Sequence, residues 1–120
     1  MTWTLILPLT RPLSLNDRTH YMVKAKQVSS LRRAVHVLAR AQNIPHLEKA
    51  HVTLHYQPRD KRRRDSDSLV ATLKPAIDGI VDAGVIPDDT PEYVSWEPPI
   101  IHPPAPKARQ GALWLTVQPR

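Results

Sequence analysis

The spacing of apolar residues divides this chain into segments with two different repeats. In two segments the apolar residues return every three or four positions, which is typical of an amphipathic helix. In four others apolar and polar residues alternate, as they do in a strand with one buried face. We therefore expect helices at 23–42 and 68–83, and strands at 2–7, 51–57, 92–97 and 112–117.

This order of elements predicts an α+β fold in which a mixed sheet of about four strands is covered by two helices. The 120 residues suit a single domain, 1–120, with neither an internal repeat nor a boundary inside it. A chain of this length buries roughly two-thirds of the surface that its unfolded form exposes. One hydrophobic core is therefore expected to hold the fold together.

Turn and cap residues predict where the helices end. Asn43 and Pro45 follow the first helical segment, and Gly84 follows the second. Pro75 lies inside the second segment and would cost about 3 kcal/mol in a regular helix. We expect that helix either to kink at Pro75 or to be regular only from near Lys74. The run 98–106 contains five prolines and is expected to be a loop.

Composition narrows the class of protein. The absence of cysteine excludes disulfides and cysteine-ligated zinc, and it favours a reducing compartment. No apolar run approaches the roughly 18 residues of a membrane span, and the start of the chain lacks the pattern of a secretory signal. We therefore expect a cytoplasmic protein that does not associate with membranes.

The charge of the chain points to a polyanionic partner. The net charge is +6 and the isoelectric point is about 10.1, which favours polyanions but also fits a merely basic, soluble protein. Basic residues gather at 59–64 and 24–40, and acidic residues gather at 65–67 and 78–92. A concentrated acidic spot within a polyanion-binding surface is most simply explained by a divalent cation.

Four aspartates are the candidate ligands of that cation. Asp65 and Asp67 precede the second predicted helix, where either one alone is more simply explained as a helix cap. Asp88 and Asp89 follow Pro87, where a tight turn is the simpler explanation. As a set they come from two elements and offer the hard oxygen ligands that Mg²⁺ prefers. Asp65, Asp67 and Asp89 are the expected main ligands, with Asp88 as a further one.

Lys74 is expected on the same side of the second helix as this acidic set. At 100° per residue, Asp67, Lys74 and Asp78 fall within roughly 20° of one stripe. A lysine there would bind a phosphate or stabilise charge in a transition state. The simpler alternative is a solvated Lys74–Asp78 pair one turn apart.

Two groups of basic residues are expected to hold a nucleic-acid backbone, because guanidinium groups bind phosphate in bidentate fashion. The first immediately precedes the aspartates, and the alternative for it is a solvated loop. The second occupies positions seven apart on one face of the first helix. The groups are Arg59, Lys61, Arg62, Arg63 and Arg64, and Lys26, Arg33 and Arg40.

The histidines and tryptophans carry weaker signals. His51 and His55 share a face of the second predicted strand, but no third nitrogen or sulfur ligand accompanies them, so no metal site is expected there. Trp114 lies in the last predicted strand and is expected in the core. The proline-rich run 98–106 suggests no function.

With these motifs in place, the sequence resembles the RusA family of Holliday junction resolvases, small endonucleases often found in phages and prophages. The resemblance is carried by three stretches: RRRDSDSL at 62–69, KPAIDGI at 74–80 and DAGVIPDD at 82–89. It extends more weakly to PLSLNDRTH at 12–20. The sequence departs from the family at Ser68, where asparagine is usual, and in a spacing from Asp67 to Lys74 that is about three residues longer.

The resemblance implies a homodimer that binds four-way DNA junctions and nicks opposing strands with Mg²⁺, or with Mn²⁺ as an alternative ion. It implies a role in recombination and repair in the cytoplasm of a bacterial host. The catalytic aspartates of the family match Asp65, Asp67 and Asp89, and its essential lysine matches Lys74. The loop after the first strand would add DNA contacts from Asn16, Arg18 and His20.

Two alternatives to junction resolution remain. The first is a DNA-binding module with weakened catalysis, which the Ser68 departure favours. The second is a metal-dependent nuclease that acts on other branched substrates such as flaps, or on RNA.

Overall fold

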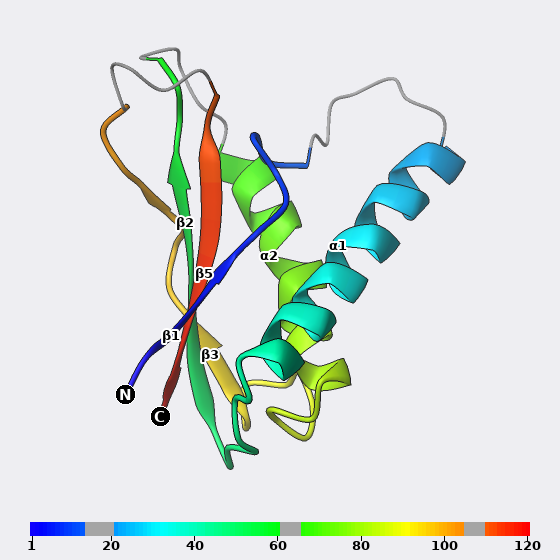
Figure 1. Cartoon of the computed structure of the whole chain (residues 1–120), viewed down its shortest axis with the longest axis vertical. Coiled ribbons are helices and arrows are strands. Elements are labelled where there is room, and N and C mark those ends of the chain that lie inside the picture. The colour runs from blue at the N-terminus through cyan, green and yellow to red at the C-terminus, as the bar shows by residue number, and fades with distance from the viewer. Residues whose placement is uncertain (14–20, 61–65, 105–109) are drawn as a thin grey trace.

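A computed structural model describes residues 1–13, 21–60, 66–104 and 110–120, with the side chains of Ser66 and Asp67 left aside. In this part of the chain two helices lie on one face of a mixed five-stranded sheet (Figure 1). The α+β class and the two covering helices are therefore as predicted. The elements are β1 (Trp3–Ile6), α1 (Tyr21–Ala41), β2 (Ala50–Gln57), α2 (Ser66–Asp82), β3 (Val94–Trp96), β4 (Ile100–Ile101) and β5 (Ala112–Pro119).

The sheet is centred on two long strands. β2 and β5 pair antiparallel with Leu54 opposite Leu115, and β1 pairs antiparallel with the other side of β5. β3 pairs parallel with β2, so β2, α2 and β3 form a strand–helix–strand crossover. This connection explains why the sheet is mixed, because parallel neighbours need a long crossover whereas antiparallel ones do not.

The sheet has five strands where about four were predicted, because the proline-rich segment adds the short strand β4. β3 and β4 pair with the same edge of β2, with Ala50 opposite Val94 and His55 opposite Ile100. Pro98 and Pro99 fall between them, and neither has an amide hydrogen to donate to a neighbouring strand. A strand of two residues is too short to show an alternating pattern in the sequence.

Both helices end where the sequence predicts, through caps in a left-handed conformation. Gly84 has a φ of 81°, its amide donates to the Val81 carbonyl (2.9 Å), and Val85 donates to Ile80 (3.1 Å). This pair of bonds is a Schellman motif. Asn43 ends α1 in the same way with a φ of 55°.

Pro75 does not divide α2, which is helical from Ser66 through Asp82. The expectation that the helix becomes regular only near Lys74 is therefore wrong. The first half of α2 is held in place by buried Thr72, whose hydroxyl donates to the Ser68 carbonyl (2.8 Å). The same oxygen accepts the Leu13 amide (2.9 Å), which ties the segment after β1 to α2. These bonds anchor the first half of α2, and Pro75 itself is buried.

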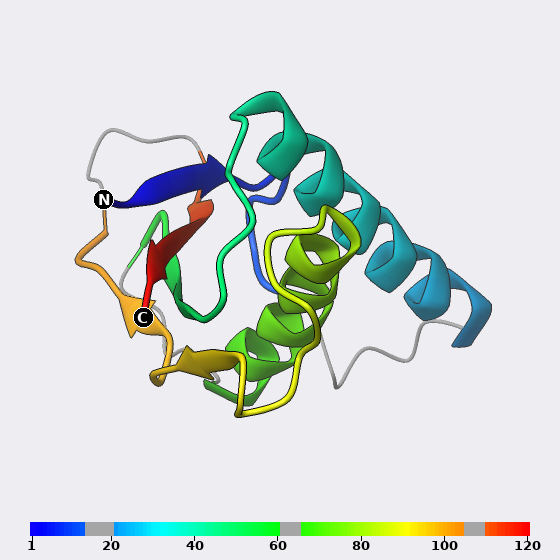
Figure 2. The same ribbon diagram turned by 90° about the horizontal axis from the view of Figure 1, so that it is seen from below.

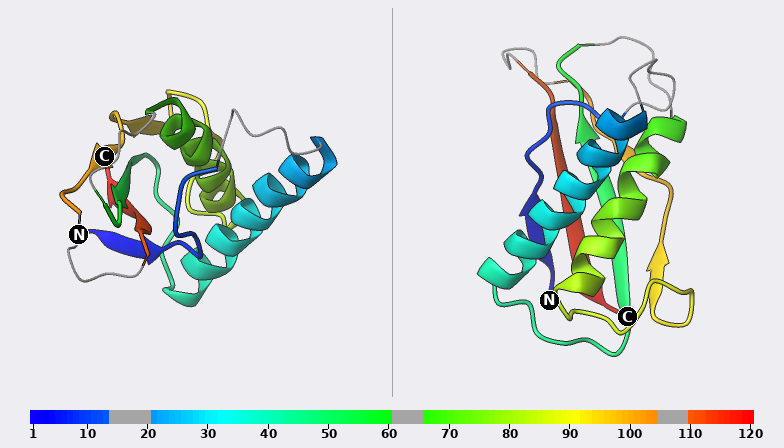
Figure 3. Two further views of the ribbon diagram at one scale, coloured as in Figure 1. Left: turned by 90° about the horizontal axis from the view of Figure 1, so that it is seen from above. Right: turned by 90° about the vertical axis from the view of Figure 1, so that its right-hand side faces the viewer.

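The helices pack tightly against each other as well as against the sheet (Figure 3). A Cβ added at Gly79 would lie 2.6 Å from the Arg32 carbonyl oxygen and 2.7 Å from Val35 Cβ, so glycine permits this close approach. At the surface of the same contact, the Arg32 guanidinium donates to both carboxylate oxygens of Asp82, at 2.6 and 2.8 Å. Neither described helix is both long and apolar enough to cross a membrane.

The second face of the sheet is not covered by either helix (Figures 1 and 2). Along β5 the side chains alternate, so Leu113, Leu115 and Val117 are buried while Trp114 and Thr116 are partly exposed on the other face. The expectation that Trp114 belongs to the core is therefore wrong. It lies on the uncovered face, beside histidines of neighbouring segments.

Candidate active site around Lys74 and Asp89

Lys74 projects from the exposed side of α2 and joins two carboxylates. Its ammonium group donates to Asp78 Oδ1 one turn further along the helix (3.1 Å) and to Asp89 Oδ2. The Lys74 side chain is 63% exposed, while those of Asp78 and Asp89 are 23% and 30% exposed. The pair with Asp78 is the i,i+4 pair that the sequence offers as the simpler alternative to a phosphate-binding role for Lys74. The pair with Asp89 links the helix to the turn that follows it.

The path of the chain after α2 explains how Asp89 reaches Lys74. The cap at Gly84 reverses the direction of the chain, and buried Val85 and Ile86 fix the next two residues in the core. The amide of Asp89 then donates to Asp88 Oδ1 (2.7 Å), a bond between adjacent residues that holds the Asp88 carboxylate against the backbone. Asp88 is exposed and supports the conformation of its neighbour through this bond.

Lys74 and Asp89 each stabilise the charged form of the other. The Lys74 ammonium lowers the pKa of Asp89 below its ordinary value, with the hydrogen bond as the main cause. The bond to Asp89, followed by the bond to Asp78, raises the pKa of Lys74. Lys74 and Asp89 are therefore both ionised at neutral pH. Asp89 is kept in the form that binds a cation, and Lys74 in the form that binds a phosphate.

One of the remaining predicted catalytic residues lies at the start of the same helix. Asp67 belongs to the first turn of α2, seven positions before Lys74. Seven residues are close to two helical turns, so the two positions share a face of α2. Asp65 and the side chain of Asp67 lie outside the described residues. Of the predicted set, contact between Lys74 and Asp89 is observed.

The expected Mg²⁺ ion needs hard oxygen ligands, of which one or two are usually carboxylates. Among the side chains of 1–13, 21–60, 68–104 and 110–120, no three histidine or acidic groups gather closely enough to hold a metal ion. Two of the predicted ligands, Asp65 and Asp67, fall outside that set. Asp89 fits the requirement, because it is an ionised carboxylate that is partly exposed and anchored at a fixed place.

Some of the predicted DNA-binding residues lie on the described surface. Lys26, Arg33 and Arg40 are exposed along α1, and Arg59 is exposed after β2, where it pairs with Asp60 (3.6 Å). The others lie outside the described residues: Asn16, Arg18, His20, Lys61, Arg62, Arg63 and Arg64.

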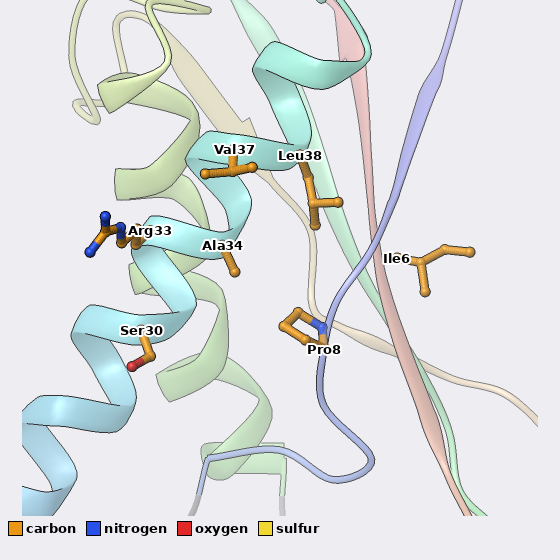
Figure 4. Close-up of a pocket in the computed structure, with 7 residues that line it drawn as sticks. All are labelled: Ile6, Pro8, Ser30, Arg33, Ala34, Val37 and Leu38. Atoms are coloured by element: carbon orange, nitrogen blue, oxygen red, sulfur yellow. The ribbon is translucent and has the colours of Figure 1, made fainter.

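A groove of about 480 Å³ runs between α1 and the segment around β1, away from Lys74 and Asp89. Ala34 and Leu38 face Pro8 across it, while the guanidinium group of Arg33 points away from the strand (Figure 4). The groove is largely apolar and shares no residue with the candidate site. Its lining residues are Ile6, Pro8, Ser30, Arg33, Ala34, Val37 and Leu38.

Sequence patterns missed two polar clusters. Arg32 and Asp82 form the ion pair between the helices, and Asp82 has a lowered pKa because of the Arg32 guanidinium. His55 and His102 meet on the uncovered face of the sheet. Helical periodicity alone does not reveal a pair that spans two helices. His102 was missed because it lies in the proline-rich run.

A comparison with models of known protein families finds no match for this chain, and a search of curated proteins finds no similar sequence.

Proposed function

We propose that this protein is a Mg²⁺-dependent endonuclease that resolves Holliday junctions and related branched DNA, as the RusA family does. One observation carries the proposal: Lys74 and Asp89, predicted as site residues from separate motifs, are in direct contact. Contact between them follows from neither motif alone, because 15 positions separate them in the chain. The motif resemblance supplies the reaction and the substrate.

The chemistry assigned to these residues is hydrolysis of a phosphodiester. A bound Mg²⁺ would neutralise phosphate charge and activate a water for in-line attack. Asp65, Asp67 and Asp89 would hold the ion, with Asp88 as a further ligand. Lys74 sits beside Asp89 with its side chain 63% exposed, where its ammonium group would stabilise the charge that develops on the phosphate oxygens.

The substrate and the assembly form the second part of the proposal. The exposed residues of α1 and the arginine run before α2 would bind the DNA backbone through phosphate contacts. Two copies in a homodimer would place two sites on the opposing strands of a junction. Junction DNA in a bacterial cytoplasm, from the host or from a phage, is the setting that this activity requires.

A cleavage assay tests the activity. We expect the purified protein to nick a labelled four-way junction with Mg²⁺ or Mn²⁺ and to be inactive with excess EDTA. Asp67→Asn should abolish cleavage and leave junction binding intact. The change removes the negative charge of one expected Mg²⁺ ligand and keeps the shape of the side chain. Normal cutting by Asp67→Asn in Mg²⁺ would show that the site is wrongly assigned.

A DNA-binding module with weakened catalysis is the second candidate, and Ser68 favours it. Ser68 stands where the family has asparagine, in the first helical turns of α2. An asparagine amide there would be able to orient a neighbouring carboxylate. If the protein binds junctions but cuts them poorly, and Ser68→Asn restores cutting, this candidate is correct. Comparison of junction, flap, duplex and RNA substrates distinguishes the remaining nuclease activities.

Sedimentation tests the assembly separately from the chemistry. We expect the sedimentation coefficient of a dimer, at least in the presence of junction DNA. A protein that stays monomeric with junction DNA present would not resolve junctions by paired nicks.

A further inference from the structure

Two histidines join the proline-rich segment to the sheet on its uncovered face. His55 belongs to β2, and His102 follows β4, which pairs with the edge of β2. His55 Nδ1 and His102 Nε2 are 2.9 Å apart, and the ring centroids are 5.2 Å apart. The two nitrogens therefore point directly at each other, as in a hydrogen bond between imidazoles. The Trp114 ring lies beside both, with its centroid 5.3 Å from that of His55 and 4.9 Å from that of His102.

The segment that carries His102 is attached to β2 by few other bonds. The His102 amide donates to the Tyr56 carbonyl at 2.8 Å, and Gln57 Nε2 donates to the Pro103 carbonyl at 3.3 Å. The strand β4 contributes only two residues to the pairing. The hydrogen bond between the imidazoles is therefore a large part of what holds this segment in place.

A second hydrogen-bond chain determines which nitrogens of the pair carry protons. The Thr116 hydroxyl donates to the Thr53 carbonyl (3.4 Å), so its oxygen accepts from His55 Nε2 at 3.1 Å. A neutral imidazole with a proton on Nε2 has a lone pair on Nδ1. His55 Nδ1 is thus the acceptor and His102 Nε2 the donor. The basic nitrogen that remains in the pair is His102 Nδ1.

The first and second protons that the pair takes up have opposite effects on this bond. A proton on His102 Nδ1 leaves Nε2 as the donor, and a charge-assisted hydrogen bond is stronger than a neutral one. A second proton must bind His55 Nδ1, where it faces the N–H of His102. Two donors and two positive charges then oppose each other, so the bond is lost. Burial of His55, followed by the charge of His102, lowers the pKa of His55, while Glu97 acts to raise it.

Glu97 is the acidic group that acts on His55. Its carboxylate accepts from the Thr53 hydroxyl (2.9 Å) and lies 3.6 Å from His51 Nε2, so it is directed towards other partners. The Glu97 side chain is 50% exposed, which lets solvent screen its charge. The β5 side chains beside His55 are an indole and a hydroxyl, neither of which titrates near neutral pH. Glu97 therefore does not offset a second positive charge on the pair.

We infer that the His55–His102 pair is a pH-sensitive switch, which holds the segment 100–103 on β2 with up to one proton and releases it with two. Because the pKa of His55 is lowered, the bound form is favoured above the ordinary value of 6.5 and loses stability as the pH falls below it. Release frees the edge of β2 at residues 55–57, whose backbone groups are then able to pair with another strand. The switch lies on the face of the sheet that α2 does not cover, so it does not depend on the proposed nuclease activity.

Hydrogen exchange of the His102 amide, followed by NMR on the full chain, tests the release. Its protection factor, which corrects for the intrinsic effect of pH, should fall at least roughly 3-fold between about pH 7.5 and about pH 5. The Leu115 amide in the middle of the sheet should keep its protection. His55→Gln should abolish the fall, because its amide oxygen accepts from His102 at any pH. Constant protection in the wild type, or an equal fall in His55→Gln, would overturn the proposal.

His102→Gln provides a second variant, because it removes the site of the first proton. The amide at position 102 should then keep its protection in acid, and a fall as large as in the wild type would contradict the switch. The matched control is His46→Gln, which removes an exposed histidine after α1 and should keep the wild-type fall. Thermal unfolding at neutral pH checks that each variant is folded.

NMR of the histidine ring nitrogens tests the order of protonation. At neutral pH His55 should carry its proton on Nε2. As the pH falls, His102 should become charged before His55. A charge that appears first on His55 would also overturn the proposal.

Discussion

Lys74 owes its place in the candidate site to two different kinds of contact. Asp78 is a neighbour on the same helix, and its position follows from helical geometry. Asp89 is a neighbour only because the chain turns back after α2. The ammonium group of Lys74 therefore joins the helix to the segment that follows it. Its effect can be measured as the pKa of Asp89.

Replacement of Lys74 by methionine should raise the pKa of Asp89, because the mutation removes the ammonium that stabilises the carboxylate. Carbon-detected NMR titration of the carboxyl group measures this directly. Lys49→Met is a matched control, since Lys49 is exposed on another part of the surface. A pKa of Asp89 that is the same in wild type and in Lys74→Met would contradict the observed ion pair.

The lowered pKa of Asp89 also determines how the pair affects stability at different pH. A carboxyl whose pKa is lower in the folded state stabilises the fold above its unfolded pKa, ordinarily 3.8. That contribution is lost as the pH falls through the lower, folded value. The difference in free energy of unfolding between wild type and Lys74→Met should therefore be present at neutral pH and disappear in acid.

At the level of single residues, patterns predicted what lies on one element and missed what joins two. Lys74 and Asp78 were placed together by the helical repeat. His102 was not connected with His55, because their contact depends on a two-residue strand within a proline-rich run. Trp114 was assigned to the core because it is apolar and lies in a strand. Those two facts do not show which face of the sheet the helices cover.

The contact between α1 and α2 depends on Gly79. A methyl group at this position would meet the Arg32 carbonyl oxygen at 2.6 Å, and a backbone atom in a helix cannot move away easily. Gly79→Ala should therefore lower the free energy of unfolding by about 1–3 kcal/mol, the usual cost of overpacking. Denaturant titration measures the change.

A control separates overpacking from the general effect of alanine in a helix. Gln27→Ala changes an exposed residue of α1 and should alter stability by less than about 0.5 kcal/mol. Alanine is a better helix former than glycine. A stabilising effect of Gly79→Ala would thus show that the helices are further apart than described.

At the level of elements, the ends of the helices and the long strands were predictable from local chemistry. Asn43 and Gly84 are residues that accept a left-handed conformation, and both occupy it. The continuity of α2 through Pro75 was not predictable, because tertiary contacts around Thr72 support that part of the helix. β4 was missed because pairing with β2, and not its own sequence, makes it a strand.

The whole molecule has two faces of different character. One side of the sheet is covered by helices (Figure 3), and Lys26, Arg33 and Arg40 of α1 are exposed. Layer architecture could be predicted from the order of elements. Which surfaces remain uncovered, and which distant side chains meet on them, could not be predicted, because that depends on sheet order.

The charge of this surface should appear in the salt dependence of DNA binding. Each phosphate contact contributes about 0.9 to the slope of log affinity against log salt concentration. Arg33→Ala and Lys26→Ala should each reduce the slope by about that amount if α1 lies on the DNA. Lys49→Ala is the control and should leave the slope unchanged. Fluorescence anisotropy with a labelled junction measures all three slopes.

Cleavage of a four-way junction by Asp89→Asn, compared with Glu92→Gln, tests the proposed active site. Both changes remove one negative charge from the same connection between α2 and β3, but only Asp89 contacts Lys74. We predict that Asp89→Asn lowers the Mg²⁺-dependent cleavage rate at least roughly 100-fold, while Glu92→Gln cuts like wild type. Junction affinity measured without metal should be similar in both. Equal cleavage rates in the two variants would show that Lys74 and Asp89 do not form the active site.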